Sequence, residues 1–116
     1  MGLPAFDEGL SEAELDRMMA KATEATEFLK AIAHEGRLMI LCHLANGERS
    51  VTELERLLSQ RQAAVSQQLA RLRLEGLVRC RREGKTVYYS LADGRTREML
   101  EAIYALFCAE AADADR

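Results

Sequence analysis

Three cysteines and two histidines carry the most reactive side chains of this 116-residue sequence. Cys42 and His43 are adjacent, whereas Cys80 and Cys108 lie far along the chain, and no pair has the CxxC spacing of dithiol redox proteins. On a helix, His43 would point about 100° away from Cys42, so it is poorly placed as a base or a metal partner. We therefore expect no enzyme, no catalytic residue and no cofactor. A metal ligand, a redox-sensing thiol and a buried apolar side chain remain open as roles of Cys42.

A second set of residues has the size and polarity that suit DNA. On a predicted helix over residues 62–75, small and polar side chains share the outward face: Gln62, Ala63, Ser66, Gln67, Ala70 and Arg71. Small residues let a helix enter the major groove, about 12 Å wide, where Gln and Ser reach base edges and Arg reaches guanine or phosphate. Arg82 and Lys85 flank the tip of a predicted hairpin, which suits phosphates or a neighbouring minor groove. These residues predict a surface for double-stranded DNA.

The distribution of charge supports the same interpretation. The whole chain carries a net charge of −3. Residues 60–97 nevertheless hold nine basic and three acidic side chains, so the rest of the chain is strongly acidic. A basic region on an acidic body is typical of a protein that binds phosphate with one face.

The elements that would position these residues follow from periodicity and capping signals. Apolar residues at helical spacing predict helices over 14–33 and 37–45, the second apolar on nearly all sides and therefore in the core. Ser50 and Glu53 have the spacing of a capping box that opens a helix to Leu58. Gly76 ends the helix that begins at Gln62, strands follow over 77–82 and 86–91, and Asp93 caps a last helix to about residue 112. The order predicts a mainly α fold, a helix-turn-helix followed by a β-hairpin wing.

Length and composition limit the class of protein. We expect a loose tail over residues 1–13 and one domain over 14–112, since the chain is too short for two domains. The sequence has no apolar run that could span a membrane and no basic, apolar start typical of a secretory signal. With an odd number of cysteines, this favours a protein of the reducing cytoplasm. Apolar stripes on the first and last helices, including Leu15, Met19, Tyr104 and Phe107, predict a homodimer.

Five segments in order resemble ArsR-type winged-helix repressors over about residues 16–110. They are residues 27–38, 50–54, 65–73, 76–78 and 85–91. The resemblance implies a homodimer that pairs through its first and last helices and releases operator DNA when an inducer binds. The sequence departs from the family at Ala63, where a hydroxyl is frequent, and at Gln68, where histidine is frequent.

The positions of two cysteines resemble one branch of that family. Metal-sensing members carry Cys-x-Cys on the helix here spanning 51–58, or His and Asp ligands on the last helix, and neither pattern is present, so we expect no metal. Cys42 and Cys108 stand where thiol-sensing, SqrR-like and BigR-like repressors have theirs. The resemblance implies that persulfides or oxidants link Cys42 to Cys108 and that the target genes serve sulfide detoxification, with Cys80 incidental. A metal-responsive repressor that uses Cys42, His43 and Cys108 is one alternative, and a ligand-independent repressor is another.

Overall fold

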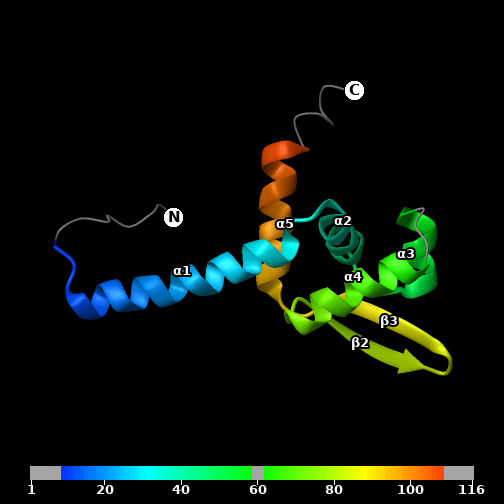
Figure 1. Cartoon of the computed structure of the whole chain (residues 1–116). Coiled ribbons are helices and arrows are strands. Elements are labelled where there is room, and N and C mark those ends of the chain that lie inside the picture. The colour runs from blue at the N-terminus through cyan, green and yellow to red at the C-terminus, as the bar shows by residue number, and fades with distance from the viewer. Residues whose placement is uncertain (1–8, 59–61, 109–116) are drawn as a thin grey trace. The chain divides into compact units, whose positions relative to one another are not determined.

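The computed structural model describes residues 9–58 and 62–108, and Figure 1 shows the order of its helices and strands. The mainly helical content with one β-hairpin confirms the predicted fold class. The chain divides into two compact units, residues 1–30 and 31–116. The single domain predicted over 14–112 stays a prediction, and most of the predicted tail, residues 1–8, lies outside the described residues.

The first unit contains helix α1 (Glu12–Ile32) as far as Lys30. The helix begins two residues earlier than predicted because Ser11 caps it. Ser11 Oγ accepts the Glu14 N–H (3.2 Å) and donates to the Glu14 carboxylate (3.1 Å). Leu15, Met19 and Leu29, from the predicted apolar stripe, are 47%, 67% and 49% exposed.

Helix α2 (Glu35–Leu44) begins two residues before its predicted start because His34 is its N-cap. His34 Nδ1 accepts the Gly36 N–H at 3.1 Å, which gives this histidine a structural role. The prediction that α2 is buried on nearly all sides is wrong. Ile40 and Leu41 are fully buried, but Met39 and Cys42 are exposed. Helix α2 packs on helices α3 (Val51–Leu58) and α4 (Gln62–Leu74) and on strand β3 (Thr86–Leu91), which leaves part of its surface uncovered.

Helices α3 (Val51–Leu58) and α4 (Gln62–Leu74) confirm the predicted pair. Gly76 follows the end of α4, and its φ of 80° is a left-handed conformation that glycine adopts without strain. The Leu77 N–H donates to the Leu72 carbonyl at 2.9 Å and closes the last turn.

The sheet has the strand order β1-β3-β2 with antiparallel pairing. Strands β2 (Val78–Glu83) and β3 (Thr86–Leu91) form the predicted hairpin, which turns at Gly84 and projects beside α3 and α4 in Figure 1. Strand β1 (Arg49–Ser50) was not predicted. Two residues are too short for a periodic signal, and only pairing with β3 makes them a strand.

Helix α5 (Gly94–Phe107) begins as predicted at its Asp93 cap, whose Oδ1 accepts the Thr96 N–H at 3.2 Å. Cys108 is its C-cap. Residues 109–112 of the predicted helix lie outside the described residues.

The core of the second unit joins α2, α3, α4 and α5. Its fully buried large side chains include Ile40, Leu41, Leu44, Leu54, Val65, Leu69 and Leu72. Packing of this density holds the outward faces of the helices in fixed positions. Among the described residues, no helix is long and apolar enough to cross a membrane.

Candidate nucleic-acid interface and thiol site

A capping box fixes the start of α3, as the sequence predicts. The Ser50 N–H donates to Glu53 Oε1 and the Glu53 N–H donates to Ser50 Oγ, both at 3.1 Å. The bond from the Ser50 backbone is the main cause that lowers the pKa of the Glu53 carboxyl. Leu54 of α3 and Leu69 of α4 are completely buried, so α3 supports α4 from the core side.

The outward face of α4 carries the residues predicted to read DNA. Of the predicted residues, Ser66, Gln67, Ala70 and Arg71 are exposed on this helix. Arg71 Nε donates to Glu75 Oε1 at 3.2 Å, an exposed pair that can open when a phosphate competes. Gln62 and Ala63 lie in the first turn of α4, but their side chains lie outside the described part of the structure.

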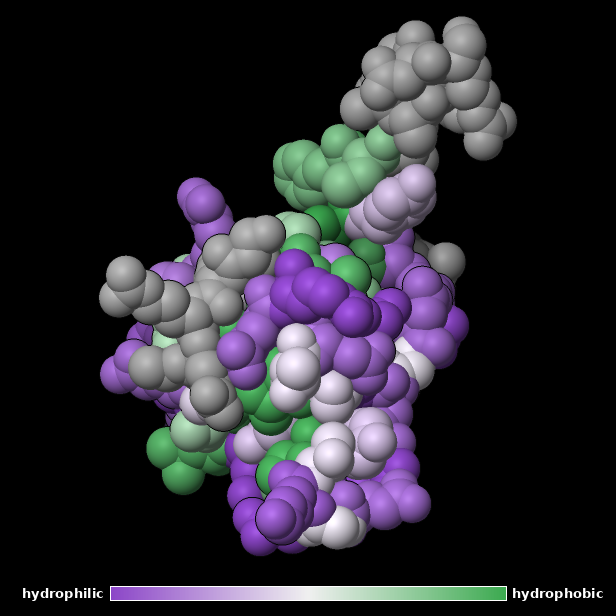
Figure 2. All heavy atoms as spheres, turned by 90° about the vertical axis from the view of Figure 1, so that its right-hand side faces the viewer, coloured by the Kyte–Doolittle hydropathy of each residue, from purple (hydrophilic) through white to green (hydrophobic). Residues whose placement is uncertain are grey.

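The wing brings its cations beside the helix pair. Lys85 lines a hollow of about 260 Å³ together with Thr52 of α3 and Ser66 of α4. Arg82 and Lys85 are exposed at the hairpin end, and the face in Figure 2 is largely hydrophilic below the end of α5. Sequence reasoning missed Thr52, although the capping box already placed it in the first turn of α3. Hydroxyls and an ammonium around one hollow suit a phosphate group.

Ion pairs neutralise much of the basic region that composition predicts. Among the described residues, four of its arginines contact carboxylates: Arg71 with Glu75, Arg81 with Glu48 and Glu83, Arg95 with Asp93, and Arg97 with Glu101. Arg82 and Lys85 pair with no carboxylate within the described ranges. The count of basic residues therefore overstates the charge that this region presents to DNA.

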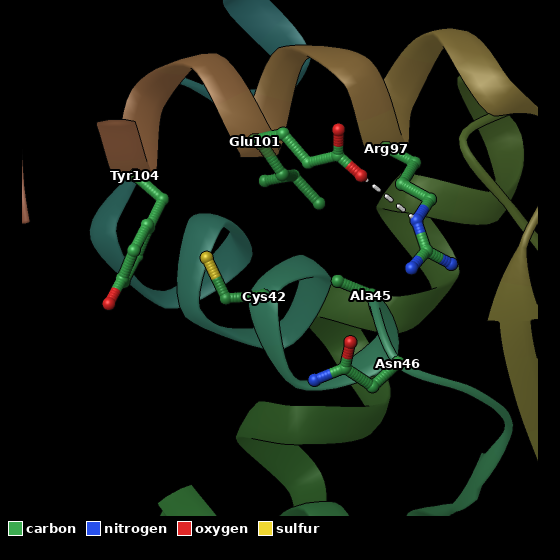
Figure 3. Close-up of a pocket in the computed structure, with 7 residues that line it drawn as sticks. Cys42, Ala45, Asn46, Arg97, Glu101 and Tyr104 are labelled. Atoms are coloured by element: carbon green, nitrogen blue, oxygen red, sulfur yellow. Dashed lines mark hydrogen bonds and ion pairs between the residues drawn. The ribbon is translucent and has the colours of Figure 1, made fainter. Parts of the chain in front are cut away.

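Cys42 faces a pocket between α2 and α5. The pocket, about 380 Å³, is lined by Cys42, Ala45, Asn46, Arg97, Leu100, Glu101 and Tyr104. Figure 3 shows the Cys42 sulfur directed toward α5, between the Tyr104 and Glu101 side chains. Arg97 Nε donates to Glu101 Oε1 at 3.2 Å, so the cation in this pocket is already paired.

Cys108 lies at the end of α5, one helical turn beyond Tyr104, which lines the pocket that Cys42 faces. Partial burial raises the pKa of the Cys42 thiol, and a negative charge on Cys108 raises it further. Both cysteines are exposed and free in this structure. Neither helix provides the positive end of its dipole, because Cys42 is mid-helix and Cys108 is a C-cap.

Cys80 and His43 lie apart from this pair of thiols. Cys80 is half-buried in β2, opposite Tyr89 of β3. Burial and the nearby Cys80 raise the pKa of Tyr89. Arg49 Nε donates a hydrogen bond to the backbone carbonyl of His43 at 2.8 Å. Within the described residues no three His, Cys, Asp or Glu side chains group as metal ligands.

Known proteins match this arrangement in sequence and in fold. Residues 34–79 match the family described as "Bacterial regulatory protein, arsR family". A "Biofilm growth-associated repressor" of Agrobacterium fabrum is 48% identical over 100 residues, 86% of this chain and 86% of its own length.

The solved structures of two relatives superpose on this chain. Reduced HlyU from Vibrio cholerae has a TM-score of 0.77 and 43% identity, over 80% of this chain and 98% of HlyU. The transcriptional repressor BigR from Xylella fastidiosa has a TM-score of 0.76 and 39% identity, over 82% of this chain and 97% of BigR. These relatives are transcriptional regulators and not enzymes. Their identity and coverage establish that this chain is a winged-helix transcriptional regulator of the arsR family.

Proposed function

We propose that this protein is a homodimeric repressor that releases operator DNA when Cys42 and Cys108 are linked by persulfides or oxidants. The observation that carries the proposal is the orientation of the Cys42 sulfur toward α5, the helix that ends at Cys108 (Figure 3). A charge on Cys108 raises the pKa of Cys42. A direct disulfide needs the two Cα atoms within about 7 Å, and inserted sulfur atoms bridge a wider gap.

Two displacement steps at sulfur would form the bridge between the cysteines, and neither needs a metal. The Cys42 thiolate attacks the outer sulfur of a low-molecular-weight persulfide, RS–SH, forms a protein persulfide and releases RS⁻. The Cys108 thiolate then attacks Cys42 Sγ, forms the disulfide and releases HS⁻. Donors with longer sulfur chains would leave additional sulfur atoms in the bridge. The pocket of about 380 Å³ beside Cys42 gives such a donor access to the sulfur.

DNA binding would use α4 and the wing in different ways. Ser66 and Gln67, with Gln62, have side chains that can bond base edges, and Ala63 and Ala70 leave room for the groove. Arg71, Arg82 and Lys85 would contact phosphates, with Arg71 also able to bond guanine.

The dimer interface would form from the first and last helices. Tyr104, Leu106 and Phe107 of α5 are 55%, 75% and 76% exposed, and hydrophobic side chains gather toward the C-terminal end of α5 in Figure 2. The exposed apolar residues of α1 would supply the other part. Apolar patches of this kind usually mark an interface, and two-fold pairing is the most frequent arrangement.

Operator release can be tested with single cysteine variants. A duplex selected from random DNA by the reduced protein serves as the operator, and fluorescence anisotropy measures its affinity before and after a persulfide donor is added. We expect about 5- to 150-fold weaker binding for the wild type, the usual range of allosteric coupling. The Cys42→Ser and Cys108→Ser variants should keep their operator affinity after the donor is added. The Cys80→Ser variant should lose affinity like the wild type.

Mass spectrometry of the same samples shows whether the bridge has formed and how many sulfur atoms it contains. An unchanged affinity after confirmed linkage of Cys42 to Cys108 would refute the switch and favour a ligand-independent repressor. Binding sites upstream of sulfide-oxidising enzymes would support the proposed target genes.

A further inference from the structure

Arg81 of the wing is held by two carboxylates and an aromatic ring. Its Nε and Nη2 donate to the two oxygens of Glu48 at 2.7 and 2.6 Å, and its Nη1 donates to Glu83 at 2.9 Å. The guanidinium carbon lies 4.6 Å from the centre of the Tyr88 ring. These bonds lower the pKa of the Glu48 carboxyl and raise the pKa of Arg81.

The contacts of Arg81 span the whole sheet. Arg81 belongs to β2, its partner Tyr88 belongs to β3, and Glu48 directly precedes β1. Because the strand order is β1-β3-β2, the arginine crosses the middle strand to reach the far edge. Arg49, which follows Glu48, donates from Nε to the His43 carbonyl of α2 at 2.8 Å. The far edge of the sheet is therefore itself bonded to a helix.

We propose that the Glu48–Arg81 pair is a brace that positions the wing against the helices, and that Arg81 is a positioning residue and not a DNA contact. The proposal rests on the proposed role of the wing in DNA binding. Beyond the two residues of β3 that pair with β1, the wing is a two-stranded ribbon. Such a ribbon is marginally stable alone, so a bond from β2 to the body limits its motion. Isolated exposed ion pairs contribute little, but this pair is bidentate and also stacked on a ring.

The neighbouring Arg82 provides the contrast that makes the assignment testable. Successive residues of a strand point to opposite faces, so Arg82 and Arg81 cannot share one task. Each guanidinium nitrogen of Arg81 already donates to a carboxylate, whereas Arg82 has no carboxylate partner in the described part of the chain. The two arginines are therefore matched in type and location but differ in their partners.

Lysine replacements separate the two roles because they keep the charge. Lysine binds a phosphate well but cannot form the planar bidentate bond to Glu48. We expect Arg81→Lys to weaken operator binding of the reduced dimer by about two- to fivefold per half-site, the range of a well-formed exposed pair. Arg82→Lys should lose less affinity than Arg81→Lys, because lysine still binds a phosphate. Glu48→Gln combined with Arg81→Lys should bind no more weakly than Arg81→Lys alone.

Salt dependence and hydrogen exchange complete the test. Arg82→Gln should reduce the slope of log K against log salt by about one unit per half-site, and Arg81→Gln should leave it unchanged. In the free protein, Arg81→Lys should speed amide exchange at residues 82–86 and Arg82→Lys should not. Wild-type affinity of Arg81→Lys, or a reduced slope for Arg81→Gln, would overturn the brace. If Arg82→Gln changes nothing either, the wing does not bind DNA and the proposed function of the wing fails, while the exchange result still tests the brace.

Discussion

The replacement Gly36→Ala tests how closely α2 packs on α4. A Cβ at Gly36 would overlap the Gln68 amide nitrogen and lie 2.9 Å from Cδ and 3.0 Å from Oε1 of the same side chain. Gln68 is half-buried, and its Oε1 is buried with no hydrogen-bond partner in the described structure. The amide is the end of a flexible side chain and must move away from the new methyl group, which disturbs the contact between the two helices.

Two opposing effects set the magnitude. Replacing glycine by alanine in an unhindered helix stabilises by about 0.5–1 kcal/mol. Overpacking a filled site costs about 1–3 kcal/mol. In the wild type Gly36→Ala should therefore lower the free energy of unfolding, by up to about 2 kcal/mol. In a Gln68→Ala background the obstacle is gone, and the same replacement should stabilise by about 0.5–1 kcal/mol. The expected coupling between the two positions is about 1–3 kcal/mol.

Urea unfolding of the reduced protein measures the coupling. All four variants of the cycle must be compared at one protein concentration, because dimerisation makes apparent stability depend on concentration. Gly94→Ala is the matched control, since nothing lies within 4 Å of a Cβ at that helical glycine. Equal effects of Gly36→Ala in both backgrounds, within about 0.5 kcal/mol, would refute the close approach of α2 to α4.

Three further outcomes are expected. Ser50→Ala should lower the free energy of unfolding by about 1–2 kcal/mol, measured in urea, because the first turn of α3 loses its cap; an unchanged midpoint would contradict the capping box. Cys108→Ser should lower the pKa of Cys42, so iodoacetamide should modify the Cys42 peptide faster at pH 8 than in the wild type, and equal rates would show that the thiols do not interact. Because Arg81 lowers the pKa of Glu48, the brace should persist above the ordinary carboxyl pKa of about 4.3 and be lost as pH falls through the lowered value; Arg81→Lys should raise that pKa in a carboxyl NMR titration.

Signals that act within a few residues were predictable from the sequence. Ser50 and Glu53 form their capping box as predicted, and Asp93 begins α5. Gly76 and Gly84 adopt the positive φ values that end a helix and turn a hairpin. Each of these features depends on local backbone chemistry, which the residue types alone specify.

Features that depend on distant partners were not predictable. Glu48 gave no signal as the partner of Arg81, since 33 residues separate them and the sheet order brings them together. Helix α2 was predicted to lie in the core because its own side chains are apolar on nearly all sides. In the structure it packs on α3, α4 and β3, and Cys42 stays exposed. Tertiary packing, and not periodicity, decides which apolar side chains remain accessible to a reagent.

The raised pKa of Cys42 has a consequence for how selective a thiol switch at this site would be. A raised pKa lowers the thiolate fraction at neutral pH about tenfold per unit, whereas the nucleophilicity of the thiolate rises only by about 10^0.4 to 10^0.5. Cys42 would therefore react more slowly with a single electrophile than an equally accessible thiol of ordinary pKa. Displacement by Cys108 requires a leaving group on the Cys42 sulfur. A reagent provides one only if it transfers sulfur or oxygen to Cys42, because an alkyl group on the sulfur cannot be displaced. Displacement by Cys108 of the same protomer would be intramolecular and therefore fast. Reagents that allow a bridge would therefore be favoured over those that only modify one thiol.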